Sequence, residues 1–437
     1  MSRIKIKNFG PIHEGFLEND GWMDIEKVTV LIGDQGSGKS TVAKLISIFS
    51  WIEKSIVKSR ISTKQLNVVV FKNLCIQQEI SEYFTPTTVI YYEGLAYIFE
   101  YDEKKKSFIA RKTANEKYNN YILPKIQYVS AARNLLTILY NVSMEYIHDK
   151  NGNIIDLSAN IPFMVKDLNK EYMKALEKLA KNGYSLPLNE TSVYYQNHST
   201  FIKAKGKAIS MAAASSGIQS ITPLMLVSHF LSEEVTTDIL DKVQYLDDNQ
   251  KKQIENNFAK DDADLVEKYK QLCNFGKGIL TKEDGIMLTG KLKSYIPSSF
   301  INIVEEPEQN LFPTSQQKMI NSLLEYNNAV KDNKLIVTTH SPYIINYLML
   351  TIKAFEIERK AKKNKEIKSK IYEIVPEKAI TPLQNVVIYE LNEKNGTITK
   401  LEHSLGLPSN EHYLNNLLGE TNMLFSNLME IEDLCEE

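Results

Sequence analysis

The alternation of apolar and polar residues divides the chain into buried strands, amphipathic helices and exposed hairpins. Three short apolar runs, residues 28–32, 300–304 and 335–339, each end in a polar stretch that is followed by a helical pattern. Continuous apolar runs of this length are typical of strands that are covered on both faces of a parallel sheet. Because such strands alternate with helices along the chain, the pattern predicts an α/β fold.

The remaining segments predict antiparallel strands and further helices. Residues 3–8 alternate polar and apolar side chains, which suits a strand half exposed at a sheet edge. Residues 67–111 contain β-rich runs broken by turn residues, so we expect an antiparallel region with two hairpins. By the same criteria we expect a strand at 126–130, hairpins at 192–211 (turn at 197–198) and 385–402, and helices at 41–58, 160–185, 212–232, much of 233–297, 353–370 and the last 30 residues.

The first buried run leads into a glycine-rich loop that fits the phosphate-binding pattern G-x-x-x-x-G-K-[ST] without substitution. The expected ATP-binding residues are Gly33, Asp34, Gln35, Gly36, Ser37, Gly38, Lys39, Ser40 and Thr41. Glycines let successive backbone N–H groups curl around a phosphate, and the helix that follows directs its positive end at the same anion. Lys39 can reach the β- and γ-phosphates, and the Ser40 hydroxyl can ligate Mg²⁺. ATP and Mg²⁺ are therefore the expected cofactors.

Polar residues also follow the other two buried runs. Glu305 and Glu306 follow residues 300–304, where one acid can hold Mg²⁺ and the next can polarise the attacking water. His340 follows residues 335–339 and is expected to contact the γ-phosphate or the water, because ligands bind at the carboxyl ends of parallel strands. A solvated acidic loop and a structural histidine are the alternative readings.

A fourth candidate lies at the start of an apolar helix. Ser215, Ser216 and Gly217 can offer backbone N–H groups to a phosphate, with Gln219 close behind. An ordinary helix cap is the commoner meaning of such a sequence.

Together these motifs resemble those of ABC-type ATPases. The loop 33–40 resembles their Walker A motif, residues 215–219 their signature, residues 300–306 their Walker B motif and His340 their switch histidine, in the same chain order. The strings IKIKNFGPI, EEPEQNLFP and TTHSPYI look specifically like the SMC-related branch. That branch includes the ATPase domains of overcoming-lysogenization-defect (OLD) nucleases and the stand-alone ATPases of prokaryotic defence operons.

The resemblance implies an ABC-type P-loop ATPase head with a mixed core sheet. It places the head at residues 1–350, with an antiparallel β-subdomain at about 67–111 and a helical lobe with insertions at about 134–298 that carries the signature. Residues 351–437 would form an α+β extension used for assembly or partner binding.

In this family ATP lies between two subunits, so the resemblance implies at least a homodimer. Ser215 or Ser216, with Gly217, would then contact the γ-phosphate of the partner's nucleotide. The implied catalytic residues are Lys39, Glu306 and His340, and the implied metal-binding residues are Ser40, Glu305 and Gln127. Gln127 is the candidate for the Q-loop glutamine, with an ordinary strand residue as the alternative.

The chain departs from the family pattern at a few positions. Glu305 stands where aspartate is usual, Phe312 stands where relatives often have histidine, and the signature reads SSG rather than SGG. Arg133, in the segment YVSAARN, can either contact a phosphate or form a structural ion pair.

Charge and cysteine content limit the class of protein. The formal net charge of −2 provides no global field for nucleic acid, although the lysine-rich residues 353–370 could touch phosphates or form a solvated face. Cys75, Cys273 and Cys435 are far apart, which argues against a disulfide framework or a zinc site and suits a reducing cytoplasm. No run approaches 18 apolar residues, so we expect a cytoplasmic protein without a membrane span.

The function favoured at this point is an ATPase subunit of an anti-phage defence complex. The resemblance to the ATPases of PARIS-type systems implies a separate toxic effector, such as a TOPRIM-like nuclease, released by a phage-encoded trigger protein in the manner of a toxin–antitoxin pair. An SMC-like DNA-repair or DNA-binding ATPase is the alternative. An OLD-type nuclease is disfavoured because the only D-x-D, at residues 262–264, precedes the Walker B motif. The SMC-like opening and the long inserted segment before the signature disfavour a transporter subunit.

Overall fold

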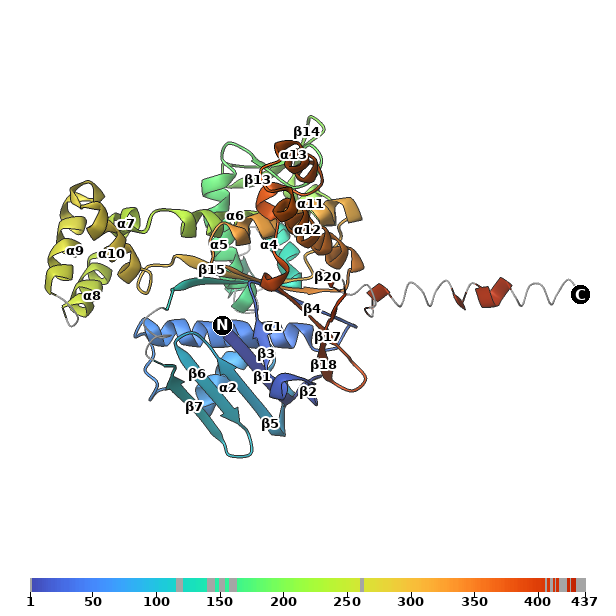
Figure 1. The fold of residues 1–437 in the computed structure, drawn as a ribbon, viewed down its shortest axis with the longest axis horizontal. Helices are drawn as coiled ribbons and strands as arrows, with labels where there is room; N and C mark the ends of the chain where they lie inside the picture. The colour runs from blue at the N-terminus through green and yellow to red at the C-terminus, as the bar shows by residue number, and fades with distance from the viewer. Residues whose placement is uncertain are drawn as a thin grey trace, which may run out of the picture.

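The computed structural model describes most of the chain. The described residues are 2–114, 121–139, 146–148, 154–156, 163–259, 263–404, 407–408, 412, 414–415, 423–424 and 426–429. The layers stack as an antiparallel sheet, the helix α1, a central sheet and a set of helices on its far face (Figure 1).

The central sheet has seven strands in the order β2-β18-β17-β4-β16-β15-β8. Five neighbouring strands, from β17 to β8, run parallel, and β18 pairs antiparallel with β17. The expected α/β fold with a mixed core sheet is thus confirmed, and the three buried runs form the adjacent strands β4, β16 and β15. The strands span Gly15–Phe16 (β2), Thr397–Lys400 (β18), Val386–Leu391 (β17), Val28–Gly33 (β4), Lys334–Thr339 (β16), Ser299–Glu305 (β15) and Pro124–Val129 (β8).

The central sheet contains strands from both sides of residue 350, where we expected the boundary between the head and the C-terminal extension. The predicted hairpin at 385–402 is present as β17 and β18, but β17 lies directly beside β4, with Leu391 opposite Gly33. The C-terminal segment therefore completes the sheet that carries the glycine-rich loop. Val28 and Val386 pair although they are 358 residues apart in the chain. Local patterns do not encode such long-range pairing.

The antiparallel sheet has the order β3-β1-β5-β6-β7. Its strands span Met23–Ile25 (β3), Ser2–Phe9 (β1), Phe84–Glu93 (β5), Tyr97–Asp102 (β6) and Ser107–Lys112 (β7). The two hairpins expected between residues 67 and 111 are confirmed as β5–β6 and β6–β7.

Two expectations for this region were wrong. The strand β1 lies between β3 and β5 rather than at an edge, because alternation reveals a covered face and not the neighbours within the sheet. The residues Val68–Gln77 form the helix α2 instead of extended chain. The Asn67 side chain accepts a hydrogen bond from the Val70 N–H, and Phe71 and Cys75 lie one turn apart in the core, so capping and burial outweigh the β-branched composition.

The helix α1 (Lys39–Val57) packs between the two sheets. Its residues Leu45, Phe49 and Ile52 are buried, and the Phe49 ring stacks on Tyr92 of β5 with centroids 5.1 Å apart. The glycine-rich loop is therefore attached to a helix that is fixed on both sides.

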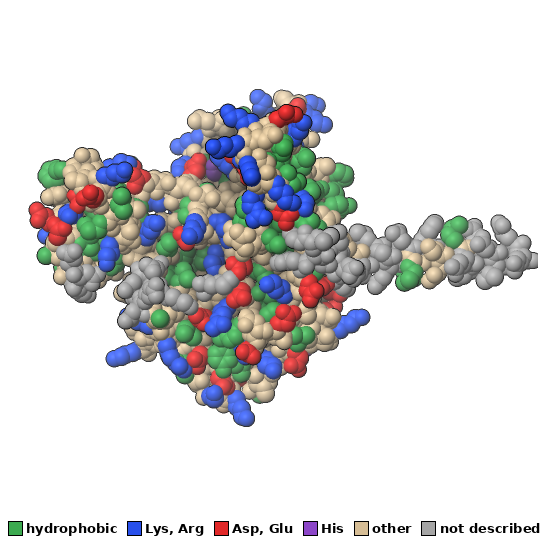
Figure 2. Space-filling model, in the orientation of Figure 1, with side chains coloured by type: hydrophobic (Ala, Val, Ile, Leu, Met, Phe, Trp, Pro, Cys, Tyr) green, Lys and Arg blue, Asp and Glu red, His purple; other side chains and the backbone are tan. Residues whose placement is uncertain are grey.

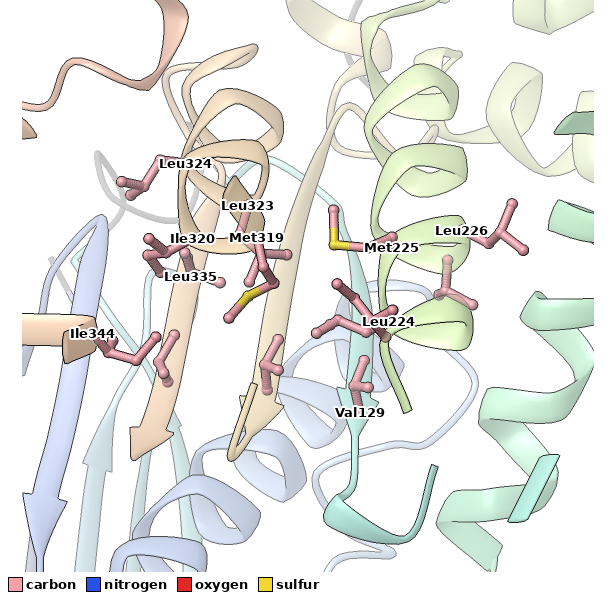
Figure 3. Close-up of a cluster of buried hydrophobic side chains, with 14 of the residues drawn as sticks. Val129, Leu224, Met225, Leu226, Met319, Ile320, Leu323, Leu324, Leu335 and Ile344 are labelled. Atoms are coloured by element: carbon pink, nitrogen blue, oxygen red, sulfur yellow. The ribbon is translucent and has the colours of Figure 1, made fainter. Parts of the chain in front are cut away.

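The far face of the central sheet is covered by long helices. They are α5 (Phe163–Leu179), α6 (Ser216–Thr236), α11 (Pro313–Asn328) and α12 (Pro342–Ala361). Figure 3 shows Met319, Ile320 and Leu323 of α11 beside Leu335 of β16, while Leu224 of α6 lies near Val129 of β8. The expected exposed helix at 353–370 is instead the end of α12 and a separate helix, α13 (Lys365–Ile374).

Several further strands and helices lie between β8 and β15. After the short helix α4 (Leu135–Leu139) come the paired strands β9 (Tyr146–His148) and β10 (Ile154–Asp156) and the sheet β11-β12-β13-β14, whose strands span Tyr184–Ser185, Thr191–Gln196, Ser199–Ala204 and Lys207–Ser210. The predicted turn at Asn197 and His198 is present, with both residues at positive φ.

A small helical lobe follows α6 and projects to one side in Figure 1. It has its own core, which includes Phe258, Tyr269 and Leu272. Its helices span Ile239–Lys242 (α7), Asp248–Phe258 (α8), Ala263–Phe275 (α9) and Lys282–Leu292 (α10). In the described part of the chain, no helix combines the length and the apolar character that crossing a bilayer requires. The helical prediction for the last 30 residues falls largely outside the described residues.

Candidate active site

The parallel strands bring most of the predicted site residues to one edge of the central sheet. In the register of the sheet, Thr339 pairs with Ile32 and Glu305 pairs with Thr338. The residues that follow these strands, including Lys39, Glu306 and His340, therefore gather at the same carboxyl edge. This is where open α/β sheets bind ligands.

The glycine-rich loop has the backbone that its sequence requires. Gly33, Gly36 and Gly38 have φ values of 143°, 84° and 97°, which side-chain-bearing residues rarely adopt. A Cβ at Gly33 would lie 2.2 Å from the Leu391 carbonyl oxygen, and one at Gly38 would lie 3.0 Å from Ile12. The strand β17 and the N-terminal turn thus hold the loop closely on two sides.

The Lys39 side chain is buried inside the glycine-rich loop. Its ammonium group donates hydrogen bonds to the carbonyl oxygens of Gly33, at 2.9 Å, and Asp34, at 2.6 Å. Burial lowers the pKa of Lys39 to about 8, against the opposing charges of nearby carboxylates, of which Glu306 is the strongest. The Lys39 ammonium group therefore lies within the loop and is hydrogen-bonded to the main chain of the loop.

The other loop residues differ in exposure. Ser37 and Thr41 are buried, Asp34 and Ser40 are half-buried, and Gln35 and Gly36 are exposed. Ser40 is the second residue of α1, directly after Lys39. Of the predicted metal-binding residues, the loop therefore contributes one accessible hydroxyl.

Glu306 and His340 contact each other across two strand ends. The Glu306 Oε1 and His340 Nε2 atoms are 3.3 Å apart, and both side chains are about one-third exposed. The hydrogen bond from His340 lowers the pKa of Glu306, and the charges of Lys39 and Arg133 act in the same direction. The Glu306 carboxylate is therefore ionised at neutral pH and able to accept a proton from water.

The backbone of Glu306 is also unusual. Its φ of 41° lies in the left-handed region, which a non-glycine residue occupies only when its surroundings hold it there. The Glu306 N–H donates to the Thr338 carbonyl oxygen at 2.9 Å. This turn directs the chain out of β15 just before Pro307.

Glu308 is a site residue that the sequence interpretation missed. One of its oxygens accepts hydrogen bonds from the Thr339 hydroxyl, at 2.7 Å, and the His340 N–H, at 2.8 Å. Its other oxygen is buried without a hydrogen-bond partner among the described residues, and burial raises the pKa of the carboxyl group. The third acid of the EEPE string was the available signal.

Glu305 is buried at the end of β15. Its Oε2 atom accepts a hydrogen bond from the Ala131 N–H at 3.1 Å. Burial, and secondarily the charge of Glu305, raises the pKa of Tyr128 well above its usual range. The Glu305 carboxylate and the Ser40 hydroxyl are hard oxygen donors of the kind that Mg²⁺ prefers. Within the described ranges there is no cluster of three or more His, Cys, Asp or Glu side chains that could hold a metal without added ligands.

Gln127 does not join this group of residues. It lies within β8 opposite Asn302, three residues before Glu305 in the register, and is buried. Its amide donates to the Tyr128 carbonyl oxygen at 3.1 Å. The position matches the alternative of an ordinary strand residue rather than that of a metal ligand.

The predicted signature lies at the start of α6. Ser215 and Ser216 are exposed, and the described structure shows no side-chain capping bond at Ser215. Gly217 packs so closely against the following loop that a Cβ would lie 2.5 Å from the Asn310 carbonyl oxygen. Gln219 is buried and donates to the carbonyl oxygens of Met211 and Ala212, so it braces the chain that precedes the helix.

Arg133 neither lines the loop nor forms an ion pair with a side chain in the described structure. Its guanidinium is fully buried and donates to backbone carbonyl oxygens, including those of Glu305 and Glu306 at 2.7 Å each. Both earlier interpretations of Arg133 are corrected, because neither considered the main chain as the partner.

Comparison with known proteins identifies one family. The model of the AAA ATPase domain matches residues 1–287. Among solved structures, the chain is similar to an SMC head domain from Thermotoga maritima, at 9% identity and a TM-score of 0.34, with 92% of this chain and 98% of that chain covered. It is also similar to an Smc head domain with an extended coiled coil bound to the C-terminal domain of ScpA, derived from Pyrococcus furiosus, at 10% identity and a TM-score of 0.34, with 99% and 100% covered. No curated protein matches the chain significantly.

Proposed function

Because this chain belongs to the AAA ATPase domain family, we propose that it binds ATP with Mg²⁺ at the carboxyl edge of its central sheet and hydrolyses it there. The observation that carries the proposal is the contact between Glu306 and His340, 3.3 Å apart, at the same sheet edge as the buried amine of Lys39. A carboxylate, a histidine that contacts it and a lysine amine thus lie together at the end of a loop with the phosphate-binding pattern.

Each residue has a defined role in this proposal. The loop N–H groups and Lys39 bind the phosphates, and Glu306 accepts the proton of the attacking water. His340 orients the Glu306 carboxylate and reaches toward the γ-phosphate. Ser40 and Glu305 would hold Mg²⁺, which neutralises charge on the phosphate oxygens when bound.

We propose further that the site is completed by a second copy of the chain. The support is the start of α6, where Ser215 and Ser216 are exposed at the positive end of a 21-residue helix. Such a terminus suits the γ-phosphate of a partner's nucleotide. ATP would then hold two subunits together, in a dimer or a larger assembly.

The proposed biological role is that of a subunit in an anti-phage defence complex. In this role the ATPase holds a toxic effector, such as a TOPRIM-like nuclease, until a phage-encoded protein triggers release. The resemblance of the motifs to defence ATPases supports the role. The lobe α7–α10 offers a surface for a partner, since Tyr245, Phe275 and Ile286 on it are 89%, 70% and 66% exposed.

An SMC-like DNA-binding ATPase is the second candidate. The observation that favours it is the gathering of Lys and Arg side chains over the region of α12 and α13 in Figure 2. Lys353, Lys368 and Lys370 form ion pairs with nearby glutamates there, which reduces the charge available to DNA phosphates. Salt-dependent DNA binding that a Lys360→Glu, Lys363→Glu variant abolishes would favour this function.

The ATPase proposal is tested by phosphate release and by binding of a fluorescent ATP analogue. Lys39→Ala should abolish both, because it removes the positive charge that binds the phosphates. Lys44→Ala, one turn further along α1, is the matched control and should behave as wild type. Undiminished hydrolysis by Lys39→Ala would contradict the ATPase proposal.

The proposed effector is tested separately. Affinity purification of this chain from the native host, with and without phage infection, should recover the effector protein.

A further inference from the structure

Arg133 occupies an unusual place for a charged residue. It follows β8 in a short turn, Ala131–Asn134, and its side chain has no exposed surface. Burying a guanidinium is costly unless its N–H groups are paired. Here Nε donates to the Ser220 carbonyl oxygen at 3.1 Å, and Nη1 donates to that of Ser130 at 3.2 Å. Nη1 and Nη2 also donate to the carbonyl oxygens of Glu305 and Glu306, respectively.

These carbonyl groups belong to segments with different roles in the proposed reaction. Ser220 lies one turn into α6, just after the exposed serines at the helix start. Glu305 and Glu306 end β15 and carry the proposed metal-binding and catalytic carboxylates. A single planar guanidinium group thus joins the helix that would meet a partner's nucleotide to the main chain of the catalytic residue in its own subunit.

Two more contacts join the same segments. The Ser220 hydroxyl lies 3.2 Å from the Gln309 side-chain oxygen. Gly217 lies against the Asn310 carbonyl group with no room for a Cβ. The start of α6 and the loop 305–310 therefore form one mechanical unit. The rest of α6 is packed tightly over the sheet, as the neighbouring side chains of Leu224, Met225 and Val129 show in Figure 3.

We propose that Arg133 is a positioning residue that couples the start of α6 to the catalytic carboxylate of Glu306. The proposal rests on the ATPase function above. When a second subunit's nucleotide engages Ser215 and Ser216, any shift of α6 moves the guanidinium. In this dry environment an N–H group left without its carbonyl is unfavourable, so the carbonyl groups of Glu305 and Glu306 move with it.

The main-chain conformation of Glu306 determines how a shift of Arg133 would affect the Glu306 carboxylate. The left-handed conformation of Glu306, with φ of 41°, is held by two bonds to its carbonyl oxygen, from Arg133 and from the Gln309 N–H at 3.0 Å, and by its own N–H bond to Thr338. A change in that conformation turns the carboxylate away from His340. Hydrolysis in one site should therefore depend on nucleotide in the other, and ATP hydrolysis should be cooperative in ATP.

The test compares wild type with Arg133→Lys in steady-state hydrolysis over a range of ATP concentrations, together with direct nucleotide binding. Lysine keeps the charge but cannot bridge three segments. We expect ATP affinity to be unchanged, turnover to fall by about tenfold to 100-fold, as displaced catalytic groups do, and cooperativity to disappear. The matched control is Arg111→Lys, an exposed residue of β7 paired with Glu100, which should keep wild-type turnover and cooperativity.

Other results would overturn the coupling. Normal turnover and cooperativity in Arg133→Lys would do so, as would an active wild type without cooperativity. A wild type with no hydrolysis would instead overturn the ATPase function itself. Should Arg133→Lys fail to fold or to bind ATP, Gln309→Ala decides, because it removes only the contact to Ser220. Weakened cooperativity with normal ATP binding in Gln309→Ala would then support the coupling. Unchanged cooperativity in Gln309→Ala would contradict the coupling.

Discussion

The His340 imidazole holds the catalytic candidate Glu306 across two neighbouring strand ends, with 3.3 Å between His340 Nε2 and Glu306 Oε1. The main chain of His340 is held in turn by Glu308, which accepts its N–H at 2.8 Å. The residues form a connected acid–histidine–acid arrangement. It orders the Glu306 carboxylate while leaving it partly exposed to a water molecule.

Glu306→Gln should bind ATP normally and lose turnover. Glutamine keeps the shape of the side chain but is a poor proton acceptor, so we expect a loss on the order of 100-fold or more. Single-turnover hydrolysis and analogue binding measure the two effects. Glu305→Gln is the companion variant, and its effect should depend on Mg²⁺ concentration. Normal turnover by Glu306→Gln with blocked turnover by Glu305→Gln would show that the roles are reversed.

ATP affinity should fall as pH rises through about 8. Burial lowers the pKa of Lys39 to about 8, and only the charged amine binds phosphate strongly. Above that pH the charged fraction falls about tenfold per unit, and the dissociation constant should rise in proportion until the bound-state pKa is reached. Titration calorimetry between pH 7 and 9.5 should also detect proton uptake on binding. Lys39→Arg should lack this pH dependence, and a pH-independent wild type would contradict the role of Lys39.

Two inactive variants should restore activity when mixed, if the sites are shared between subunits. Ser216→Asp places a negative charge at the exposed start of α6, where it should repel a partner's γ-phosphate. Gly217 is unsuitable for this purpose, because any side chain there meets Asn310 of its own subunit. A mixed dimer of Ser216→Asp and Lys39→Ala contains one site with both defects and one with neither. The intact site should recover only a small part of the wild-type rate, at the level expected for Arg133→Lys, because the other site holds no nucleotide. The absence of any recovery after confirmed subunit exchange would contradict a site shared between subunits.

Stability should fall between pH 4.5 and 7 because of Glu53 on α1. This buried carboxyl accepts hydrogen bonds from the Ala96 and Tyr97 N–H groups, yet burial raises its pKa from 4.5 to about 7. The folded state then binds more protons than the unfolded state in this window, so stability decreases as pH rises, by on the order of 3 kcal/mol.

The measurement for Glu53 is urea unfolding at pH 5 and pH 8. Glu53→Gln keeps an acceptor oxygen for both N–H groups and removes the titration. It should be more stable than wild type at pH 8 and close to it at pH 5. An equal difference at both pH values would show that Glu53 does not cause the pH dependence.

Local spacing was sufficient to predict the glycine-rich loop between strand and helix, the three buried strands, the hairpins and the α/β class. Each of these depends on neighbouring residues: glycines at positive φ, a continuous apolar run, or a turn between β-rich segments. The expectation that polar residues would gather at one edge followed from the parallel arrangement alone.

Long-range packing decided which segments, distant in the sequence, lie beside each other in the fold. It brought β17 beside β4, gave β1 two neighbours and buried Gln127 within β8. It also aimed Arg133 at carbonyl groups up to 173 residues away. A backbone carbonyl is present in every residue and leaves no mark in the sequence. The partners of a buried guanidinium can therefore be known only once the chain has folded around it.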